Sequence, residues 1–523
     1  MPLELNQLPD NTESLKQIIT SQQHEIDHLQ EMVRLLQNEI FGRKSEVCPL
    51  VNPNQLQLFT PPEEPEPIES DETIEIKGHA RKKRGRKPLP ADLPRVEILH
   101  DIPEEEKQCA CGAQKSCIGE DTSEKLDYVP AKMRVLRHIR PKYACKQCEG
   151  VEDDGPTVAI APVPVQLISK SIATEGLLAH IAVSKFADGL PLYRQQKIFS
   201  RLDVELSRAT MANWMIQAAG CCKPVIELLH REIRSGPMIN IDESPFQVLN
   251  EPGRSNTSKS YMWVFCGGPL DSPVVLYQYH PTRSGKVVQE ILEDYLGYVQ
   301  SDGYSGYDHL SRNPDIIHLG CLAHARRKFV EVNKGRKKAR GKKKGSKGLS
   351  EEALDTIGEL YRIEKYAREK ELSFDQIRNL RQEKAKPILD RFKIWLDTHH
   401  PQVPPKSLLG KAIQYTLNQW ERLIVYLEAG FLKPDNNAAE NAIRPFVLGR
   451  KNWLFAGAPK GAEASATFFT LIESAKANGL EPYAYLRYLF EKLPFSETES
   501  DYLKLLPNRV DQDVLSAATT TWA

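Results

Sequence analysis

The sequence predicts a multidomain α+β protein in which an α/β domain with a helical insertion is preceded by smaller modules. Three observations support this class. First, a chain of 523 residues has room for several domains. Second, its first 152 residues contain a heptad repeat and two close cysteine pairs. Third, strand patterns alternate with helix patterns after residue 236. We expect a coiled-coil helix, a small zinc-ribbon-like module and a helical region ahead of the α/β domain.

The overall composition excludes some classes of protein. Lys plus Arg and Asp plus Glu each number 70, so the net charge of 0 gives no whole-chain indication of a polyanionic partner. No apolar run approaches the roughly 20 residues of a membrane-spanning helix, and the N-terminus lacks a basic-then-apolar signal pattern. Ten cysteines without a signal peptide do not indicate a disulfide scaffold. We therefore expect a protein of the reducing cytoplasm with no membrane partner.

The first segment, residues 1–48, carries a heptad repeat. Its core positions are separated by four and three residues in turn: Leu15, Ile19, Gln22, Ile26, Leu29, Val33, Leu36 and Ile40. β-Branched residues at a and leucines at d favour a parallel two-stranded coiled coil, whose register the polar Gln22 would help to set. One amphipathic helix docked on the protein's own core is the alternative, but the regular period of about 3.5 residues favours self-association. We expect a homodimer or a higher oligomer.

Residues 49–100 are predicted to form a linker. Its first half is rich in proline and acid, whereas residues 77–88 contain seven Lys or Arg and no acid. The core of this basic segment, Arg84, Gly85 and Arg86, resembles an AT-hook, in which glycine admits the backbone to a narrow minor groove and the arginines enter its negative potential. A solvated linker or a non-specific phosphate contact is the alternative.

Residues 101–152 carry two close cysteine pairs, Cys109 with Cys111 and Cys145 with Cys148. Two such pairs separated by a β-rich stretch bring four thiolates within tetrahedral reach of one zinc ion, as in zinc ribbons. The first pair is more tightly spaced than the second, and Cys117 is an alternative ligand. The sequence therefore predicts a structural Zn²⁺ site, with reduced buried cysteines as the alternative.

Residues 165–235 are helical by periodicity. One helix is expected to end near Leu202, and a second is expected to begin after Ser207 as its N-cap. Because Arg208 and Asn213 lie on the second helix, the pair has the form of a helix-turn-helix with a recognition helix that contacts DNA. Ordinary helical packing is the alternative.

Residues 236–475 show the pattern of an α/β domain. The expected elements are strands at 238–248, 260–268 and 273–281, a helix at 284–296, a strand at 297–303, a helix at 304–310, a strand at 315–323 and a helix at 324–332. The order β-β-β-α-β-α-β-α is that of the ribonuclease H-like fold of the retroviral-integrase type, in which the first and fourth strands are neighbours. We expect carboxylates near the ends of these two strands to converge.

Three acidic residues fall at positions suited to such convergence. Asp242 and Asp302 lie at the ends of the first and fourth strands, and Glu440 lies one turn into a later helix. Two convergent carboxylates are the minimum for holding a divalent cation, and a third completes a two-metal site for Mg²⁺ or Mn²⁺. Glu243 is expected to point to the opposite face of its strand.

Polar and basic residues accompany Glu440 on its helix. Asn437 and Arg444, three residues before it and four after it, share its face, and Arg450 and Lys451 follow on a basic stretch. A lone acid is usually a solvated surface residue, so it is the combination that favours a site here. We expect these four neighbours to contact DNA.

A further cluster follows the fifth strand. Cys321 and His324 form a CxxH pattern, which alone is a weak indication of a metal site. We expect it to pack or orient elements near the carboxylates, with Arg326 and Arg327 towards DNA.

A helical insertion at about 331–430 accounts for the long stretch of chain between the second and third acids. Within it, residues 334–347 hold nine Lys or Arg in fourteen positions, which suits both salt-dependent phosphate contact and a solvated loop. Residues 476–523 are predicted to form a C-terminal helical tail.

Several motifs together resemble those of the DDE transposases of the insertion-sequence-66 family, found in bacterial mobile elements. The most specific are CLAHARRKF and NNAAENAIRPFVLGRKNWLFAG, and the IDES, SDGY, GRKPLPADLPR and PLYRQQKIFSRL segments extend the resemblance over nearly the whole chain. By this resemblance Asp242, Asp302 and Glu440 take the DDE roles. The CxC spacing of the first cysteine pair departs from the CxxC of the family.

The resemblance implies a DNA transposase that cleaves element ends and transfers the freed strands into target DNA with Mg²⁺ or Mn²⁺. It also implies element terminal repeats and target DNA as partners, companion proteins from the same element, and a location with the nucleoid in the bacterial cytoplasm. Two alternatives remain from the sequence: a catalytically inactive DNA-binding regulator derived from a transposase, and a structure-selective nuclease of the same fold.

Overall fold

A computed structural model describes five residues near the N-terminus (11, 16, 19, 22 and 23) and then residues 133–144, 158–340 and 348–522. The predictions for nearly all of the coiled coil, for the linker with Arg84, Gly85 and Arg86, and for the four zinc-ligating cysteines lie outside these residues. Contacts divide the chain into a unit of residues 44–139 and a unit formed by the rest, to which the elements below belong. In this second unit, β1 (Lys142–Ala144) and β2 (Val158–Ile160) form an antiparallel pair.

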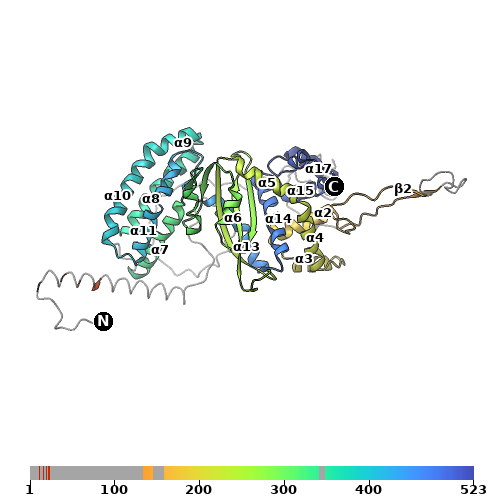
Figure 1. Cartoon of the computed structure of the whole chain (residues 1–523), viewed down its shortest axis with the longest axis horizontal. Coiled ribbons are helices and arrows are strands. Elements are labelled where there is room, and N and C mark those ends of the chain that lie inside the picture. The colour runs from red at the N-terminus through yellow and green to blue at the C-terminus, as the bar shows by residue number, and fades with distance from the viewer. Residues whose placement is uncertain are drawn as a thin grey trace, which may run out of the picture. The chain divides into compact units, whose positions relative to one another are not determined.

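The centre of the larger unit is a mixed β-sheet (Figure 1). Its strands are β3 (Met238–Val248), β4 (Lys259–Gly267), β5 (Val274–His280), β6 (Gly297–Gln300), β7 (Ile316–Leu319) and the short β8 (Phe455–Ala456). The spatial order is β5-β4-β3-β6-β7, with β8 paired to the far end of β3. The β3–β4 and β4–β5 pairs are antiparallel, whereas β3–β6 and β6–β7 are parallel. The first and fourth long strands are therefore neighbours.

Several expected elements of this domain differ from the structure. The strands expected at 297–303 and 315–323 are limited to β6 and β7, and the helix expected at 324–332 begins earlier, as α7 (Leu322–Arg340). The helix expected at 284–296 is limited to α6 (Lys286–Ile291), and Asp294, at a positive φ of 58°, lies in the turn that leads to β6. The helix expected at 304–310 is wrong, because the chain forms two 3₁₀ turns, η4 (Ser305–Tyr307) and η5 (Leu310–Arg312). Gly306 packs so closely on the ring of Tyr304 that a Cβ atom there would lie 2.3 Å from it. Short 3₁₀ turns of this kind are common as connectors between elements.

Helices cover the sheet on the β5 side. The first hydrophobic core joins the sheet to helices from both ends of the unit: α2 (Glu175–Phe186), α3 (Leu192–Ser200), α4 (Arg208–Cys221), α5 (Lys223–Glu232), α14 (Pro459–Ala477), α15 (Pro482–Lys492), α16 (Glu499–Leu503) and α17 (Gln512–Trp522). α14 also closes the edge of β5, because Thr470 and Ser474 accept hydrogen bonds from the main-chain N–H groups of Tyr277 and Val275 at 2.8 and 2.9 Å. Hydroxyl groups thus take the place of a further strand.

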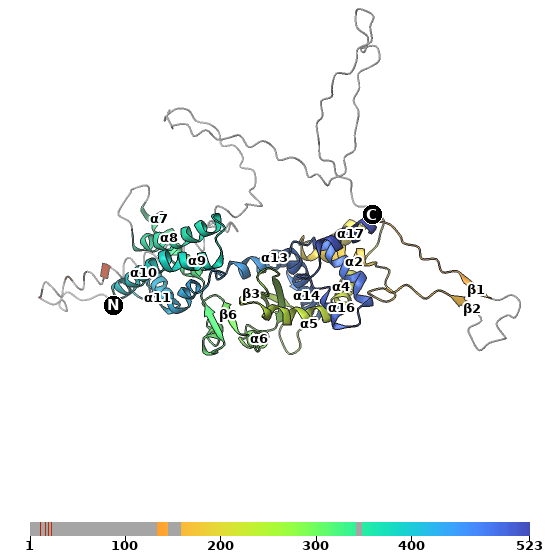
Figure 2. The same cartoon turned by 90° about the horizontal axis from the view of Figure 1, so that it is seen from above.

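The helices between β7 and α13 (Asn437–Trp453) are grouped together in Figure 2, and all of them except the short α9 (Phe374–Leu380) contribute residues to a second hydrophobic core. They are α7 (Leu322–Arg340), α8 (Leu349–Glu369), α9 (Phe374–Leu380), α10 (Lys386–His399), α11 (Leu408–Asn418) and α12 (Trp420–Ile424). Leu322, Ala325 and Phe329 of α7 belong to this core. In the part of the chain that the structure describes, no helix is both long and apolar enough to span a membrane.

Arg381 is a buried cation at the centre of these helices, on the π-helical turn η6 (Arg381–Ala385). Its guanidinium donates to both carboxylate oxygens of Glu364 at 2.8 and 2.7 Å. It also donates, at 2.8 Å each, to three main-chain carbonyls, those of Tyr426, Ala429 and Leu432. A single side chain therefore ties η6 to α8 and to the chain that leads to α13.

We predict that Arg381→Met lowers the free energy of unfolding by about 3–5 kcal/mol, because it leaves a carboxylate and three buried carbonyls without their donor. Urea unfolding followed by circular dichroism measures the change. Arg391→Met is the matched control, since this cation pairs with Glu359 at 3.5 Å while its side chain is 71% exposed, and its loss should cost less than about 1 kcal/mol. Equal losses for the two variants would contradict the prediction.

Candidate active site

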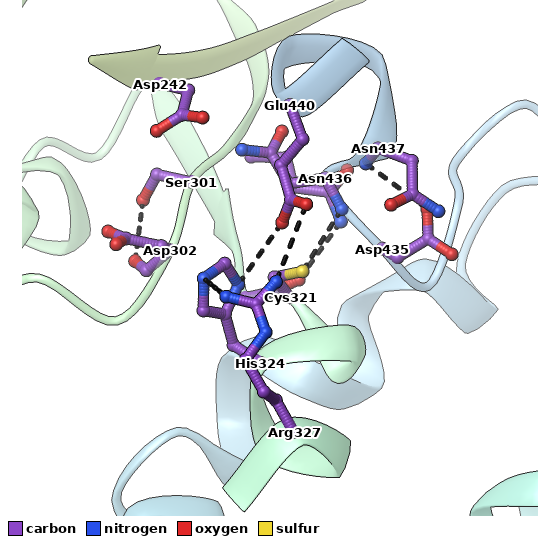
Figure 3. A network of polar contacts seen from close by, with 12 residues as sticks. Asp242, Ser301, Asp302, Cys321, His324, Arg327, Asp435, Asn436, Asn437 and Glu440 are labelled. Carbon is purple, nitrogen blue, oxygen red and sulfur yellow. Dashed lines mark hydrogen bonds and ion pairs between the residues drawn. The ribbon is translucent and has the colours of Figure 1, made fainter. Parts of the chain in front are cut away.

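The structure brings Asp242, Asp302 and Glu440 together around one space (Figure 3). Asp242 lies on β3, Asp302 follows the end of β6 by two residues, and Glu440 lies in the first turn of α13. Because β3 and β6 are parallel neighbours, their acids lie at the same end of the pair. Burial, then the neighbouring Glu243 carboxylate, and then the charges of the other two acids raise the pKa of Asp242 to about 7.

Hydrogen bonds hold the two aspartates in place. The main-chain N–H of Glu243 donates to Oδ1 of Asp242, and that of Tyr304 donates to Oδ1 of Asp302, both at 2.9 Å. Next to Asp302, the hydroxyl of Ser301 lies 2.8 Å from Nε2 of His318. Burial lowers the pKa of His318 to about 3, so its ring is neutral at physiological pH. His318 therefore holds the loop after β6 in place through a hydrogen bond to Ser301 and adds no positive charge beside Asp302.

Glu440 faces two residues of α7. Nδ1 of His324 lies 3.6 Å from its Oε1, and an Nη atom of Arg327 lies 3.6 Å from its Oε2. Nη1 of Arg327 also lies 3.3 Å from Nε2 of His324, and because a guanidinium only donates, that nitrogen is the acceptor. Burial, and then the charge of Arg327, lower the pKa of His324. Nδ1 of this ring faces Oε1 of Glu440 without a hydrogen bond between them.

The donor set at this space fits a hard divalent cation. Carboxylate oxygens are the ligands that Mg²⁺ and Mn²⁺ prefer, and Oε1 of Glu440 is a buried acceptor without a hydrogen-bond partner. Cys321, His324 and Glu440 also have ligand atoms within 4.8 Å of one another. Cys321 is the least suited of these to a cation, because burial raises the pKa of its thiol to about 12 and its sulfur accepts the main-chain N–H of Asn436 at 3.2 Å.

Glu243, the neighbour of Asp242 on β3, has its carboxylate engaged elsewhere. The guanidinium of Arg283 and the hydroxyl of Tyr307 both donate to it, and Arg283 lies over the ring of Tyr304 at 3.5 Å. These contacts occupy the Glu243 carboxylate, and its pointing to the face opposite Asp242 stays a prediction. Sequence reasoning missed Arg283 and Tyr307, because no local pattern links either of them to Glu243.

The expected DNA-contacting residues lie mostly on exposed helix faces. Exposed positions are Arg208 and Asn213 on α4, Arg327 on α7, and Asn437, Arg444 and Lys451 on α13. Half-buried positions are Arg326 and Arg450, the latter donating to the hydroxyl of Ser244 at 3.3 Å. Ser207 caps α4 as expected, by accepting from the main-chain N–H of Thr210 at 3.0 Å. Of these residues, Arg327 lies 3.6 Å from Glu440, whereas Arg208 and Asn213 lie on a separate helix, α4.

Comparison with known proteins identifies the family. A model described as "Transposase IS66 family" matches residues 170–464, and one described as "zinc-finger binding domain of transposase IS66" matches 106–149. A leucine-zipper model described as "Transposase C of IS166 homeodomain" matches 28–98, and the "IS66 C-terminal element" matches 470–507. The chain therefore belongs to the IS66 family of transposases, and it also carries segments that match a leucine-zipper model and a zinc-finger model.

Similar proteins from Sinorhizobium fredii (strain NBRC 101917 / NGR234) span almost the same length. "Uncharacterized protein y4jD" is 34% identical over 97% of this chain and 97% of its own. "Uncharacterized protein y4qI" is 34% identical over 96% of this chain and 92% of its own. "Uncharacterized protein y4hP" is 30% identical over 87% of this chain and 83% of its own. The similarity to these relatives therefore extends over most of the chain.

We predict that Asp242→Asn stabilises the metal-free protein at pH 8 and has little effect near pH 4. Above its unfolded pKa of 3.8 the unfolded state releases this proton, while the native state keeps it up to a pKa of about 7, so the aspartate costs stability as the pH rises. At about 1.4 kcal/mol per pKa unit, the gain at pH 8 has an upper bound of about 4 kcal/mol. Urea unfolding in chelator at both pH values measures it, and a gain that does not change with pH would contradict the prediction.

Proposed function

We propose that this protein catalyses metal-dependent cleavage at the ends of a mobile element and transfers the freed 3′ ends into target DNA. The observation that carries the proposal is the arrangement of Asp242, Asp302 and Glu440 around one space, in a chain that belongs to a transposase family. The family description supports a DNA transposase, and the three acids supply the ligands that phosphodiester chemistry requires.

We also propose that the domain has a ribonuclease H-like fold. The spatial order β5-β4-β3-β6-β7, with an antiparallel meander followed by two parallel strands, supports this assignment. In such a sheet, acids on the first and fourth strands are adjacent, as Asp242 and Asp302 are here. The stretch from α7 to α12, which contains the second core, would then be an insertion ahead of the helix that carries Glu440.

Asp242, Asp302 and Glu440 would hold two Mg²⁺ or Mn²⁺ ions. When bound, such ions lower the pKa of an attacking water or 3′-hydroxyl and offset the charge of the phosphate. The protein's own contribution is orientation: main-chain N–H groups hold the aspartates, and His324 and Arg327 direct the carboxylate of Glu440.

Basic residues on two helices would position the DNA strands. Arg444, Arg450 and Lys451 follow Glu440 along α13, and Arg327 of α7 lies 3.6 Å from it, next to Arg326 in the sequence. Phosphates bound near the acids would then meet guanidinium or ammonium groups.

Other parts of the chain would recognise the element and pair its ends. The segment around Arg84, the zinc module and α4 with Arg208 and Asn213 would contact terminal repeats, and the zipper segment would join two chains. Companion proteins of the same element would complete the complex, which would work at the bacterial nucleoid. The zipper and zinc-finger models matched by this chain support these roles.

We predict that Asp302→Asn and Glu440→Gln each abolish strand transfer while leaving DNA binding nearly intact. Loss of a direct metal ligand should exceed the ten- to hundredfold effect typical of outer partners, so we expect a loss of about a hundredfold or more. A Mg²⁺-dependent assay with the element's own end sequences measures joined product, and a gel shift measures binding. Asp315→Asn is the control, because this carboxylate is exposed, ahead of β7.

The outcomes separate the candidate functions. Joined product from wild type and Asp315→Asn alone supports the transposase. Cleavage without joined product would indicate a nuclease. DNA binding without any product, even after the element's other gene products are added, would indicate a regulator. Full activity of Asp302→Asn would remove that residue from the site.

We predict about one Zn²⁺ per chain in the native protein, and its loss in Cys145→Ser, because a structural zinc site needs all four ligands. Elemental analysis of the purified protein measures the metal. Cys221→Ser is the control, since this free cysteine is exposed on α4. A native zinc content near zero would contradict the prediction.

A further inference from the structure

Three buried amide side chains connect the elements that carry the three acids. Asn240 lies two residues before Asp242 on β3, and Gln300 is the last residue of β6, two residues before Asp302. The third, Asn436, is the N-cap of α13. Their exposed fractions are 8%, 0% and 1%, so their polar atoms depend mainly on partners within the protein.

The three amides are hydrogen-bonded in a chain. Nδ2 of Asn240 donates to Oε1 of Gln300 and to Oδ1 of Asn436, both at 2.9 Å. Asn240 and Gln300 are also directly opposite each other in the β3–β6 pair. Since Asn240 bonds to both of the others, it is the centre of the chain.

Main-chain carbonyls determine which way each amide is oriented. Nε2 of Gln300 donates to the carbonyls of Gly320 and Lys433 at 3.0 Å each, so its oxygen must face Asn240. Nδ2 of Asn436 donates to the carbonyl of Ile241 at 2.8 Å, so its oxygen also faces Asn240. Asn240 therefore directs its Nδ2 to both neighbours, and the three linked amides have a single arrangement. A shift of either strand or of α13 would leave buried polar groups unpaired, which is costly.

Each amide is close to one acid along the backbone. Residues two apart on a strand point to the same face, which links Asn240 to Asp242. Gln300 precedes Asp302 by the same interval at the end of β6. On α13, the main-chain N–H of Glu440 donates to the carbonyl of Asn436 at 3.1 Å. The position of every acid is thus tied to one member of the chain.

We propose that Asn240, Gln300 and Asn436 are positioning residues that hold the three carboxylates together for metal binding. This inference rests on the proposed function, because it assigns the same acids to a cation. Like charges at one site repel each other, and without a cation something else must oppose their separation. A neutral amide chain does so without adding a positive charge, which would compete with the metal.

The test compares two buried glutamines, of which only Gln300 belongs to the three hydrogen-bonded amides. Gln195 on α3 is 2% exposed, and its Nε2 also donates to two main-chain carbonyls, those of Ile181 and Leu190. Its Oε1 has no hydrogen-bond partner, whereas that of Gln300 accepts from Asn240. Gln195→Met and Gln300→Met therefore each remove two hydrogen bonds to main-chain carbonyls, and only Gln300→Met also breaks the link to Asn240.

Mn²⁺ binding to the full-length protein is measured by electron paramagnetic resonance, with thermal unfolding and strand transfer alongside. Loss of an outer partner of a metal site typically weakens binding ten- to hundredfold, so we expect about that loss in Gln300→Met, with strand transfer partly restored by excess Mn²⁺. Gln195→Met should bind Mn²⁺ as wild type does, at a similar cost in melting temperature. If Gln300→Met fails to fold, Asn240→Ser, which breaks both links between amides, replaces it.

Two results would overturn the inference. One is wild-type Mn²⁺ affinity in folded Gln300→Met, or in Asn240→Ser where that replaces it. The other is an equal loss of affinity in Gln195→Met. Both are distinct from failure of the proposed function, in which the wild-type protein itself would neither bind Mn²⁺ through the acids nor join DNA.

Discussion

The repulsion among three carboxylates around one partly buried space is the constraint on which this structure depends. Burial and neighbouring charge together raise the pKa of Asp242 to about 7. The fold opposes the repulsion with weak or neutral partners: main-chain N–H groups for the aspartates, and contacts of 3.6 Å from His324 and Arg327 for Glu440. None of these partners takes up all the oxygen lone pairs, so the acids retain the capacity to bind a cation.

Helix α7 connects this site to the second hydrophobic core. Leu322, Ala325 and Phe329 pack into that core, while His324 and Arg327 on another face of the same helix approach Glu440. The orientation of Glu440 therefore depends on how α7 is packed, and the buried Arg381 strengthens the same group of helices. Stability of the second core and geometry of the site are coupled through one helix.

Local patterns predicted much of the fold. The bounds expected for β3 match the structure, and those for β4 and β5 differ by one residue at each end, because runs of β-branched and aromatic side chains specify strands locally. The helix expected at 304–310 is wrong, because the chain there forms two 3₁₀ turns. The three acids were named from strand ends and a helix start, positions that are also local.

The sequence by itself determined the family, the order of the strands along the chain and the acids that carry the proposed chemistry, because each of these follows from short motifs and periodic patterns. Only the tertiary structure decided what holds the acids. Asn240 bonds to partners 60 and 196 residues away in the sequence. His324 lies 3.6 Å from Glu440, although the helices of the second core separate the two residues along the sequence. No periodic pattern encodes such pairs, since they depend on directional hydrogen bonds that form only when distant segments have packed.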